Sequence, residues 1–204
     1  MSVDACYSSI KMVYEVIVQK KLTVPTAVAK WTEMFEIVED DWPAIYKQPY
    51  MVTRETKLQS LQYKIIHRIV PCRKWLHIQR VVDSPFCTSC NDKVDDLCHH
   101  FIECIQVKQF WKSLENWWNK TGGYKVKLTN KHIIFGFYDD NGQFESINFI
   151  ILLAKWFIQK QGYLQCKIEL YNFLVMLKHH LQVERYICAG NNKLNIFNKK
   201  WLKI

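Results

Sequence analysis

The chain has 204 residues, a formal net charge of +9 and an apolar content of 49%. With only 6 Gly, 5 Pro and no low-complexity tract, this composition excludes disordered and fibrous proteins and predicts one globular domain, with or without a small appendage. The longest apolar run, residues 147–158, is too short to span a bilayer, so we expect no membrane partner and no secretion.

Helical periodicity runs through most of the chain, and no convincing set of alternating strands interrupts it. We therefore predict a mainly α fold, a helical domain with a small zinc-binding loop and helix and little or no β-sheet. Gly162 is the expected end of the most apolar helix. The expected helices cover residues 6–19, 25–35, 54–70, 107–121, 144–160 and 168–186, with further ones beginning at Trp42 and after Gly190, and a short apolar segment lies at 132–137.

The chain divides naturally into three regions. Residues 1–50 form an N-terminal helical linker region, residues 51–120 hold a basic helix and a cysteine-rich unit, and residues 121–204 form a C-terminal helical region that packs on it. Basic residues are in excess on both sides of the cysteine-rich unit, which itself is acidic. Such an excess favours a polyanionic partner, nucleic acid before membrane.

The segment 54–70 is the clearest helix, and Pro71 ends it. Its apolar side carries Leu58, Ile65, Ile66 and Ile69, and a basic edge adjoins that side when successive residues are placed 100° apart. Basic side chains there would bind phosphates with an affinity that depends on salt and little on sequence. The candidate nucleic-acid-binding residues are Arg54, Lys57, Lys64, Arg68, Arg73 and Lys74, for each of which an ordinary solvated surface is the alternative.

Four of the eight cysteines and two adjacent histidines lie within the short stretch CTSCNDKVDDLCHHFIEC. Zn²⁺ prefers thiolate and imidazole ligands, and a Cys-x2-Cys pair such as Cys87 and Cys90 presents two sulfurs from one tight turn. With Cys104 and one histidine the pattern becomes C-x2-C-x8-H-x4-C. Four protein ligands leave no position for a substrate, so the predicted site is structural. Clustered cysteines also indicate a reducing compartment.

The spacing leaves two histidines open as the fourth ligand. His99 gives an H-x4-C spacing that is known at zinc sites, whereas His100 lies four residues before the last cysteine and would share a helix face with it. Cys98 is expected to be a small buried apolar residue. The acidic residues of the intervening spacer, Asp92, Asp95 and Asp96, are expected to form an exposed turn.

Several stretches of this chain resemble the zinc-binding domain at the C-terminal end of non-LTR (LINE-type) retrotransposon reverse transcriptases. The most specific are SPFCTSC, HHFIEC and QFW, around the cysteines. The stretch TRETKLQSLQYKIIHRIVPCRKWL resembles the helix before the zinc site, and NKLNIFNKKW resembles the common chain end of these proteins. The resemblance covers most of the chain.

The resemblance implies a ligand set and a function. In that family the histidine stands five residues before the last cysteine, which selects Cys87, Cys90, His99 and Cys104, with His100 as the alternate. It also implies an intracellular protein, in the nucleus or cytoplasm, that grips RNA, an RNA–DNA hybrid or target DNA and takes no small-molecule substrate. Because the polymerase and endonuclease parts are missing from the sequence, we expect no enzymatic activity of its own.

Two alternatives remain. One is a structural or protein-interaction domain whose zinc stabilises a helical docking surface; the other is a part of an active reverse transcriptase when joined to a polymerase core. The stretch FYDD at 137–140 resembles the catalytic hairpin of reverse transcriptases, but no upstream carboxylate framework accompanies it, and a polar turn ending at Gly142 explains it better. The helical spacing of Trp111, Trp117 and Trp118 indicates core positions more than base-stacking platforms.

Overall fold

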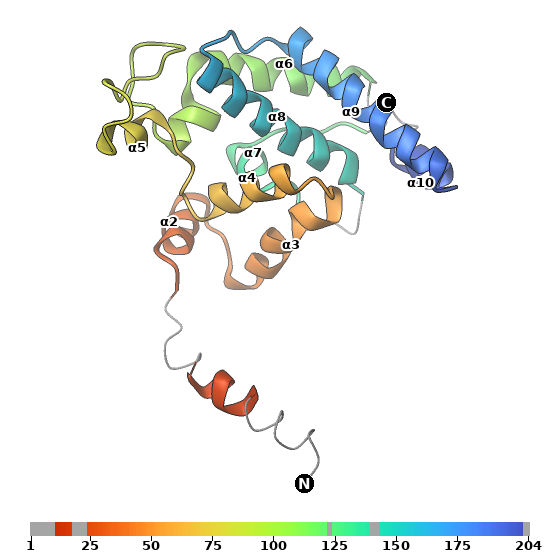
Figure 1. Cartoon of the computed structure of the whole chain (residues 1–204), viewed down its shortest axis with the longest axis horizontal. Helices are drawn as coiled ribbons and strands as arrows, with labels where there is room; N and C mark the ends of the chain where they lie inside the picture. The colour runs from red at the N-terminus through yellow and green to blue at the C-terminus, as the bar shows by residue number, and fades with distance from the viewer. Residues whose placement is uncertain (1–10, 18–23, 122–123, 139–142, 202–204) are drawn as a thin grey trace. The chain divides into compact units, whose positions relative to one another are not determined.

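The fold is mainly α, as predicted, and in the part of the chain that the structure describes the only β-type pairing is an isolated antiparallel bridge between Phe86 and Val94. The chain divides into two compact units, residues 1–36 and 37–204. The described helices include none long and apolar enough to cross a membrane. The computed structural model (Figure 1) describes residues 11–17, 24–121, 124–138 and 143–201.

The described residues of the first unit form two helical segments. Residues 11–17 are helical and exposed, and the rest of the helix expected over 6–19 lies outside the described residues. Helix α2 (Thr26–Phe35) begins directly after Pro25, where the fixed φ of proline suits a helix start. Trp31 stacks on Phe35 within it, with the ring centroids 5.6 Å apart. The predicted helix over 25–35 is therefore confirmed.

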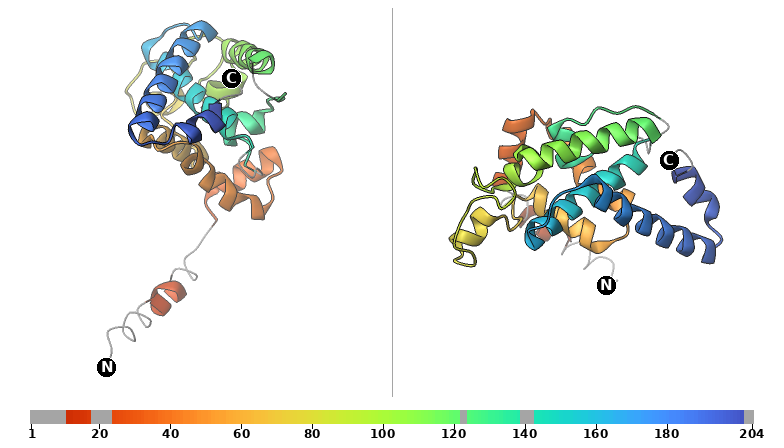
Figure 2. Two further views of the ribbon diagram at one scale, coloured as in Figure 1. Left: turned by 90° about the vertical axis from the view of Figure 1, so that its right-hand side faces the viewer. Right: turned by 90° about the horizontal axis from the view of Figure 1, so that it is seen from above.

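The second unit is built around one buried helix. Helix α8 is apolar on almost every side, and a helix of that kind belongs at the centre of a core. It packs against α3, α4, α9, α10 and η2 (Figures 1 and 2), which confirms the central position predicted for it. The elements of this unit are η1 (Glu39–Asp41), α3 (Trp42–Val52), α4 (Thr56–Ile66), α5 (Arg73–Ile78), η2 (His99–Glu103), α6 (Ile105–Thr121), α7 (Asn130–Phe135), α8 (Glu145–Leu164), α9 (Leu170–Gly190) and α10 (Leu194–Trp201).

The helix expected over 54–70 is shorter than predicted. Helix α4 ends at Ile66, and Arg68 then takes a left-handed φ of 56°. Leu58, Ile65 and Ile66 are buried as predicted, but Ile69 is 52% exposed, because the chain has left the helix and turned before reaching it. The prediction for Ile69 was wrong for that reason.

Gly162 does not end α8, which continues to Leu164 and stops at Gln165, a residue with a left-handed φ of 53°. A Cβ atom at Gly162 would lie 3.0 Å from Cε1 of His100. The glycine therefore permits η2 to approach α8 closely, a packing requirement that mimics a stop signal in the sequence.

The predicted core role of two tryptophans is confirmed. Trp111 and Trp118 are buried, and their indole N–H groups donate to the carbonyls of Phe101 (2.8 Å) and Tyr124 (3.1 Å). Trp117 is half-buried on the same helix. The residues Asp139 and Asp140 and the predicted turn at 139–142 lie outside the described residues.

Candidate metal centre

A tight loop presents the first two cysteines. The bridge between Phe86 and Val94 closes the loop, and within it Cys87 N–H donates to the Lys93 carbonyl (2.9 Å) and its own carbonyl accepts from Asn91 N–H (2.8 Å). Asn91 has a left-handed φ of 53°, which asparagine adopts more readily than most residues. This turn places Cys90 beside Cys87.

A π turn presents the other two candidate ligands. The Asp96 carboxylate accepts from the His99 backbone N–H (3.0 Å) at the start of η2. Cys104 N–H then donates to the carbonyl of His99, 3.0 Å away, which closes an i to i+5 turn. Cys104 directly precedes α6, where the Gln106 and Val107 N–H groups donate to its sulfur.

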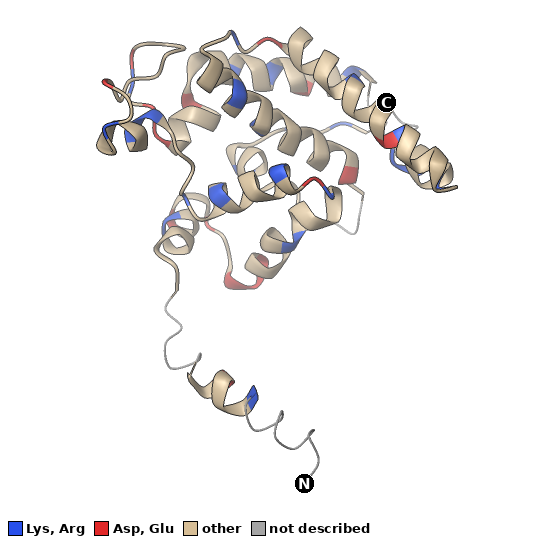
Figure 3. Cartoon of the chain, in the orientation of Figure 1, with Lys and Arg blue, Asp and Glu red and all other residues tan. Residues whose placement is uncertain are grey.

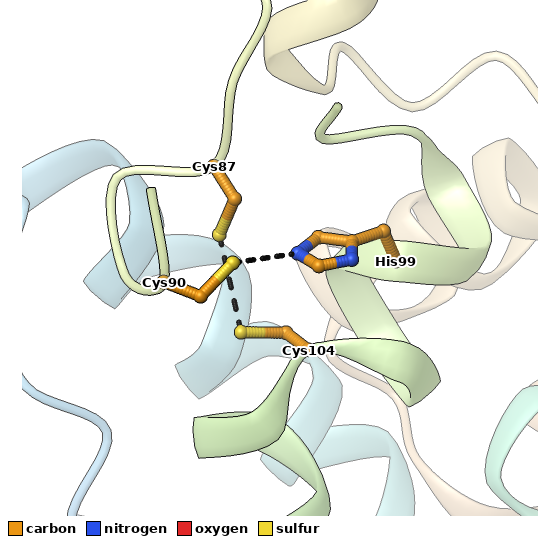
Figure 4. A group of neighbouring side chains, drawn as sticks. All are labelled: Cys87, Cys90, His99 and Cys104. Carbon is orange, nitrogen blue, oxygen red and sulfur yellow. Dashed lines mark hydrogen bonds between the residues drawn. The ribbon is translucent and has the colours of Figure 1, made fainter. Parts of the chain in front are cut away.

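The four side chains converge on one point (Figure 4), with all four ligand atoms of Cys87, Cys90, His99 and Cys104 within 4.8 Å of one another. The Cys87 and Cys104 sulfurs lie 3.9 Å apart, and the Cys90 sulfur lies 3.4 Å from His99 Nε2. Tetrahedral zinc with bonds of about 2.3 Å to sulfur and about 2.0 Å to nitrogen would separate these pairs by roughly 3.8 and 3.5 Å. This cluster can hold a metal ion, and its spacing and donor types fit zinc.

The sulfurs of Cys87 and Cys104 are joined by a hydrogen bond. A hydrogen bond to Cys104 raises the pKa of Cys87 to about 12, and the same bond lowers the pKa of Cys104 to about 7. Backbone N–H groups of Ser89 and Cys90 also point at the Cys87 sulfur and favour its thiolate. A divalent ion would replace the shared proton, since thiolate is the form that binds metal.

His100 lies outside this cluster and pairs with an aspartate. Its Nδ1 is 3.0 Å from Asp95 Oδ1 and 3.2 Å from Oδ2, and Asp95 Oδ2 also accepts from the Arg73 backbone N–H (3.1 Å). Burial, the largest single effect, raises the pKa of Asp95, but the hydrogen bond and charge of His100 together with the Arg73 N–H lower it by more in sum, so that the net shift is downward. The Asp95 carboxylate thus fixes the start of α5 against η2.

The expectation that the acidic spacer forms an exposed turn is wrong for Asp95, which is 3% exposed, and incomplete for Asp96, which caps η2. Asp92 alone is exposed as expected. Sequence reasoning missed Asp95 because a run of aspartates between two ligand pairs looks like a solvated turn. One signal was available: Asp95 lies five residues before His100, which is not needed as a metal ligand and so could pair with a carboxylate.

Cys98 is buried, as expected, and lies beside Arg68 instead of the metal cluster. Burial raises the pKa of its thiol, although the Arg68 guanidinium acts in the opposite direction. Cys72 is also buried, and burial raises the pKa of its thiol strongly. The nearby negative charge of Asp95 raises this pKa further. Both are packing residues outside the four-residue cluster.

Basic residues lie on α4 and α5, among other elements (Figure 3). By burial the candidate basic residues fall into two groups: Arg68 and Arg73 are half-buried, whereas the other four are exposed. Arg54 precedes α4, so it does not share the helix face on which it was placed, while Lys57 and Lys64 do share one. Lys57 pairs with Glu55 at 2.8 Å. The exposed set is Arg54, Lys57, Lys64 and Lys74.

No model of a known protein family matches this chain, and a search of curated proteins found no significant relative. Its function therefore has to be argued from the geometry of the site and from the charge around it.

Proposed function

We propose that this chain is a non-catalytic nucleic-acid-binding module, stabilised by zinc, of the type found at the C-terminal end of LINE-type retrotransposon reverse transcriptases. The observation that carries the proposal is the convergence of Cys87, Cys90, His99 and Cys104. These are the residues that the family resemblance selects, including His99 in preference to His100. The C-x2-C-x8-H-x4-C pattern and the fold around it thus support the same ligand set.

Zinc in this cluster would hold structure and perform no chemistry. Three sulfurs and one imidazole complete a tetrahedral shell, so that no position is left for water or substrate. The cluster connects the loop that carries Cys87 to the helical segment that ends at Cys104. The metal would therefore fix α5 and α6 relative to one another through that loop.

RNA, an RNA–DNA hybrid or target DNA would be bound by the exposed basic side chains near this unit. Lys57 and Lys64 lie seven residues apart along α4 and so face the same way, and Lys74 lies on α5. The Asp95 carboxylate is buried and pairs with His100, which limits its repulsion of phosphate. A partly exposed lysine contributes through long-range attraction that salt screens.

The experiment is a salt series with fluorescent single-stranded RNA, an RNA–DNA hybrid and duplex DNA. We expect affinity to fall as salt rises. In the double variant Lys64→Glu, Lys74→Glu it should be at least about tenfold weaker at low salt, with a salt slope reduced by about 2. The matched control is the double variant Lys112→Glu, Lys120→Glu on α6, which makes the same change in net charge on another helix and should have a smaller effect.

Absence of binding at low salt, or an affinity that salt leaves unchanged, would contradict the proposal. A protein-interaction domain would then be favoured by the outer face of α9, where Tyr171 and Tyr186 are 74% and 82% exposed. Large exposed aromatic side chains of this kind are common in protein interfaces. That function predicts no nucleic-acid affinity in the intact chain and no effect of the lysine variants.

A further inference from the structure

Helix α9 runs along the outside of the second unit (Figure 2) and packs there against α6, α8 and α10. Phe173 and Leu177 lie on the packed side and are buried. The other side of the helix is exposed. It carries the two most exposed large apolar side chains among the described residues, Tyr171 at 74% and Tyr186 at 82%.

The two tyrosines belong to one stripe on the exposed side. When successive residues are placed 100° apart, five exposed residues fall within about 80° of one another and form what we call the tyrosine stripe: Tyr171, Val175, Lys178, Gln182 and Tyr186. The tyrosines stand fifteen residues apart in α9, which is about 22 Å along the helix axis. Each ring is therefore free to meet a separate group of the same extended ligand.

The charge on this side of α9 is positive. The structure describes α9 throughout, and none of its exposed residues is acidic. The one acidic residue of the helix, Glu184, bonds to Lys200 Nζ (3.1 Å) and to Trp201 Nε1 (3.0 Å) in α10. Lys178 and Arg185 are exposed. A ligand of this side thus meets uncompensated positive charge, which attracts phosphate.

The order of residues along the stripe favours a nucleic acid over a protein as the ligand. The centre of a protein interface is usually apolar and depleted of charged residues. Here the charged Lys178 and the polar Gln182 occupy the middle, between Tyr171 and Tyr186. Proteins that bind single strands combine positive charge along the backbone with separated aromatic rings on which bases stack. A duplex hides its base faces inside the stack, so only a single strand can use such rings.

The stripe also lies close to one of the basic residues already considered. His180 Nδ1 in α9 lies 2.9 Å from Glu55 Oε1, and the other oxygen of Glu55 pairs with Lys57 Nζ (2.8 Å). These contacts bring the start of α4 beside the middle of α9. Lys57 can therefore attract the same strand that the stripe binds.

We propose that the tyrosine stripe binds single-stranded nucleic acid by stacking bases on Tyr171 and Tyr186, while Lys178 attracts the phosphates between them. The inference rests on the proposed function, because it takes the bound polymer to be a nucleic acid. It adds the class of ligand, a single strand, and a site on α9. Since every base has a face that can stack, the binding depends little on sequence.

The test uses fluorescence anisotropy with the intact, zinc-loaded chain and three probes: twelve-nucleotide oligouridine RNA, an abasic oligomer of the same length, and a twelve-base-pair RNA duplex. In the double variant Tyr171→Leu, Tyr186→Leu we expect at least about tenfold weaker binding of oligouridine, a loss of about 1.4 kcal/mol. The affinities for the abasic oligomer and the duplex should stay within about twofold of wild type. The salt slope should not change, because no charge is altered.

Two further variants separate stacking from other effects of the substitution. Tyr171→Phe, Tyr186→Phe should keep most of the oligouridine affinity, because the ring faces remain. The single variant Tyr186→Leu should bind oligouridine about threefold more weakly, half of the double variant's effect on a logarithmic scale. Its matched control is Tyr50→Leu on α3, where the tyrosine is 59% exposed, and this variant should bind all three probes like wild type.

The outcomes distinguish this proposal from the proposed function. If the double leucine variant binds oligouridine as tightly as wild type, with a normal salt slope, the stripe proposal is overturned and the proposed function stands; the outer face of α9 is then left to a protein partner. Equal weakening on all three probes would also overturn it, since the abasic oligomer has no base to stack. If wild type binds none of the probes at low salt, both are wrong.

Discussion

Cys104 donates its backbone N–H to the carbonyl oxygen of His99 across 3.0 Å, and this bond makes a π turn of the segment between them. In an α-helix, residues five apart point about 140° away from one another. The wider turn brings both side chains to the same side. His99 therefore joins Cys104 in the metal cluster, and His100 is turned toward Asp95.

The two histidines should respond differently to the same substitution. In His99→Gln we expect a loss of stoichiometric zinc, because an imidazole ligand is removed, and a lower unfolding temperature. In His100→Gln the zinc content should stay near one ion per chain, with some loss of stability from the broken contact to Asp95. Elemental analysis of the two purified variants measures the zinc content, and thermal unfolding measures the stability. Zinc retained in His99→Gln and lost in His100→Gln would reverse the ligand assignment.

Chelation should loosen the cysteine-rich loop before the rest of the fold. The loop has little apolar burial of its own, since Val81 is 67% and Phe86 48% exposed, and metal binding is coupled to folding in such segments. With EDTA we expect amide hydrogen exchange to speed up across residues 86–96 by at least about tenfold, while the buried centre of α8 stays protected. The double variant Cys87→Ser, Cys104→Ser should already show fast exchange without EDTA. Uniform acceleration in all helices would contradict a local role.

A conformational prediction concerns Gly136, which has φ 77° and ψ −172°, a combination that is nearly exclusive to glycine. A Cβ atom there would lie 2.6 Å from Gln48 Nε2 and 2.8 Å from Asn148 Oδ1. Asn148 accepts from Phe137 N–H (2.7 Å) and donates to its carbonyl (2.9 Å), so displacing it breaks a buried pair of hydrogen bonds. We expect Gly136→Ala to lower the free energy of unfolding by about 2–4 kcal/mol.

The control for this substitution is Gly190→Ala, which has no heavy atom within 4 Å of the new Cβ. Since Gly190 lies in α9, alanine should leave stability unchanged or raise it by up to about 1 kcal/mol. Urea unfolding of both variants gives the comparison. Equal stability of Gly136→Ala and wild type would show that the backbone at 136 relaxes easily.

The sequence was informative where a local pattern decides the outcome. Apolar residues on every side of α8 predicted its central position, and the Cys-x2-Cys spacing indicated the loop that pairs Cys87 with Cys90. It was uninformative where two distant segments meet. Nothing local in the sequence reveals that Gly162 makes room for His100, or that Asp95 is buried beneath α5, because each depends on contacts made only after folding.

The choice between His99 and His100 as the metal ligand also depends on geometry that the sequence does not show. An assumed α-helix would have favoured His100, four residues before Cys104, and the residues alone contain no signal for a π turn. The prediction of His99 came from the motif spacing of the family that the sequence resembles, and helical periodicity did not contribute to it. Helix ends were also uncertain, as with α4, whose end at Ile66 is set by the left-handed residue Arg68.

The buried amine of Lys155 should give the fold a measurable pH dependence. Lys155 lies in α8, where its Nζ donates to Gln62 Oε1 (2.5 Å) and to the carbonyl of Ile134 (2.8 Å). Burial lowers its pKa from the ordinary 10.5 to about 7. Between these values the unfolded chain binds a proton that the folded chain does not. This group therefore makes the folded state more stable as pH rises, by up to about 1.4 kcal/mol per pH unit.

Lys155→Met removes that contribution, so its stability relative to wild type should be most favourable at pH 7 and should decline toward pH 9. The matched control is Lys160→Met, an exposed position on the same helix, whose difference from wild type should not change with pH. Urea unfolding at pH 7, 8 and 9 gives the free energy of unfolding of each variant relative to wild type. Subtracting the wild-type value cancels the contribution of the thiols, which titrate in all three proteins. Parallel curves for wild type and Lys155→Met would mean that the amine keeps its charge in the core. Its hydrogen bonds to Gln62 and Ile134 would then have to stabilise an ammonium ion without a carboxylate partner, which the desolvation of a buried charge makes costly.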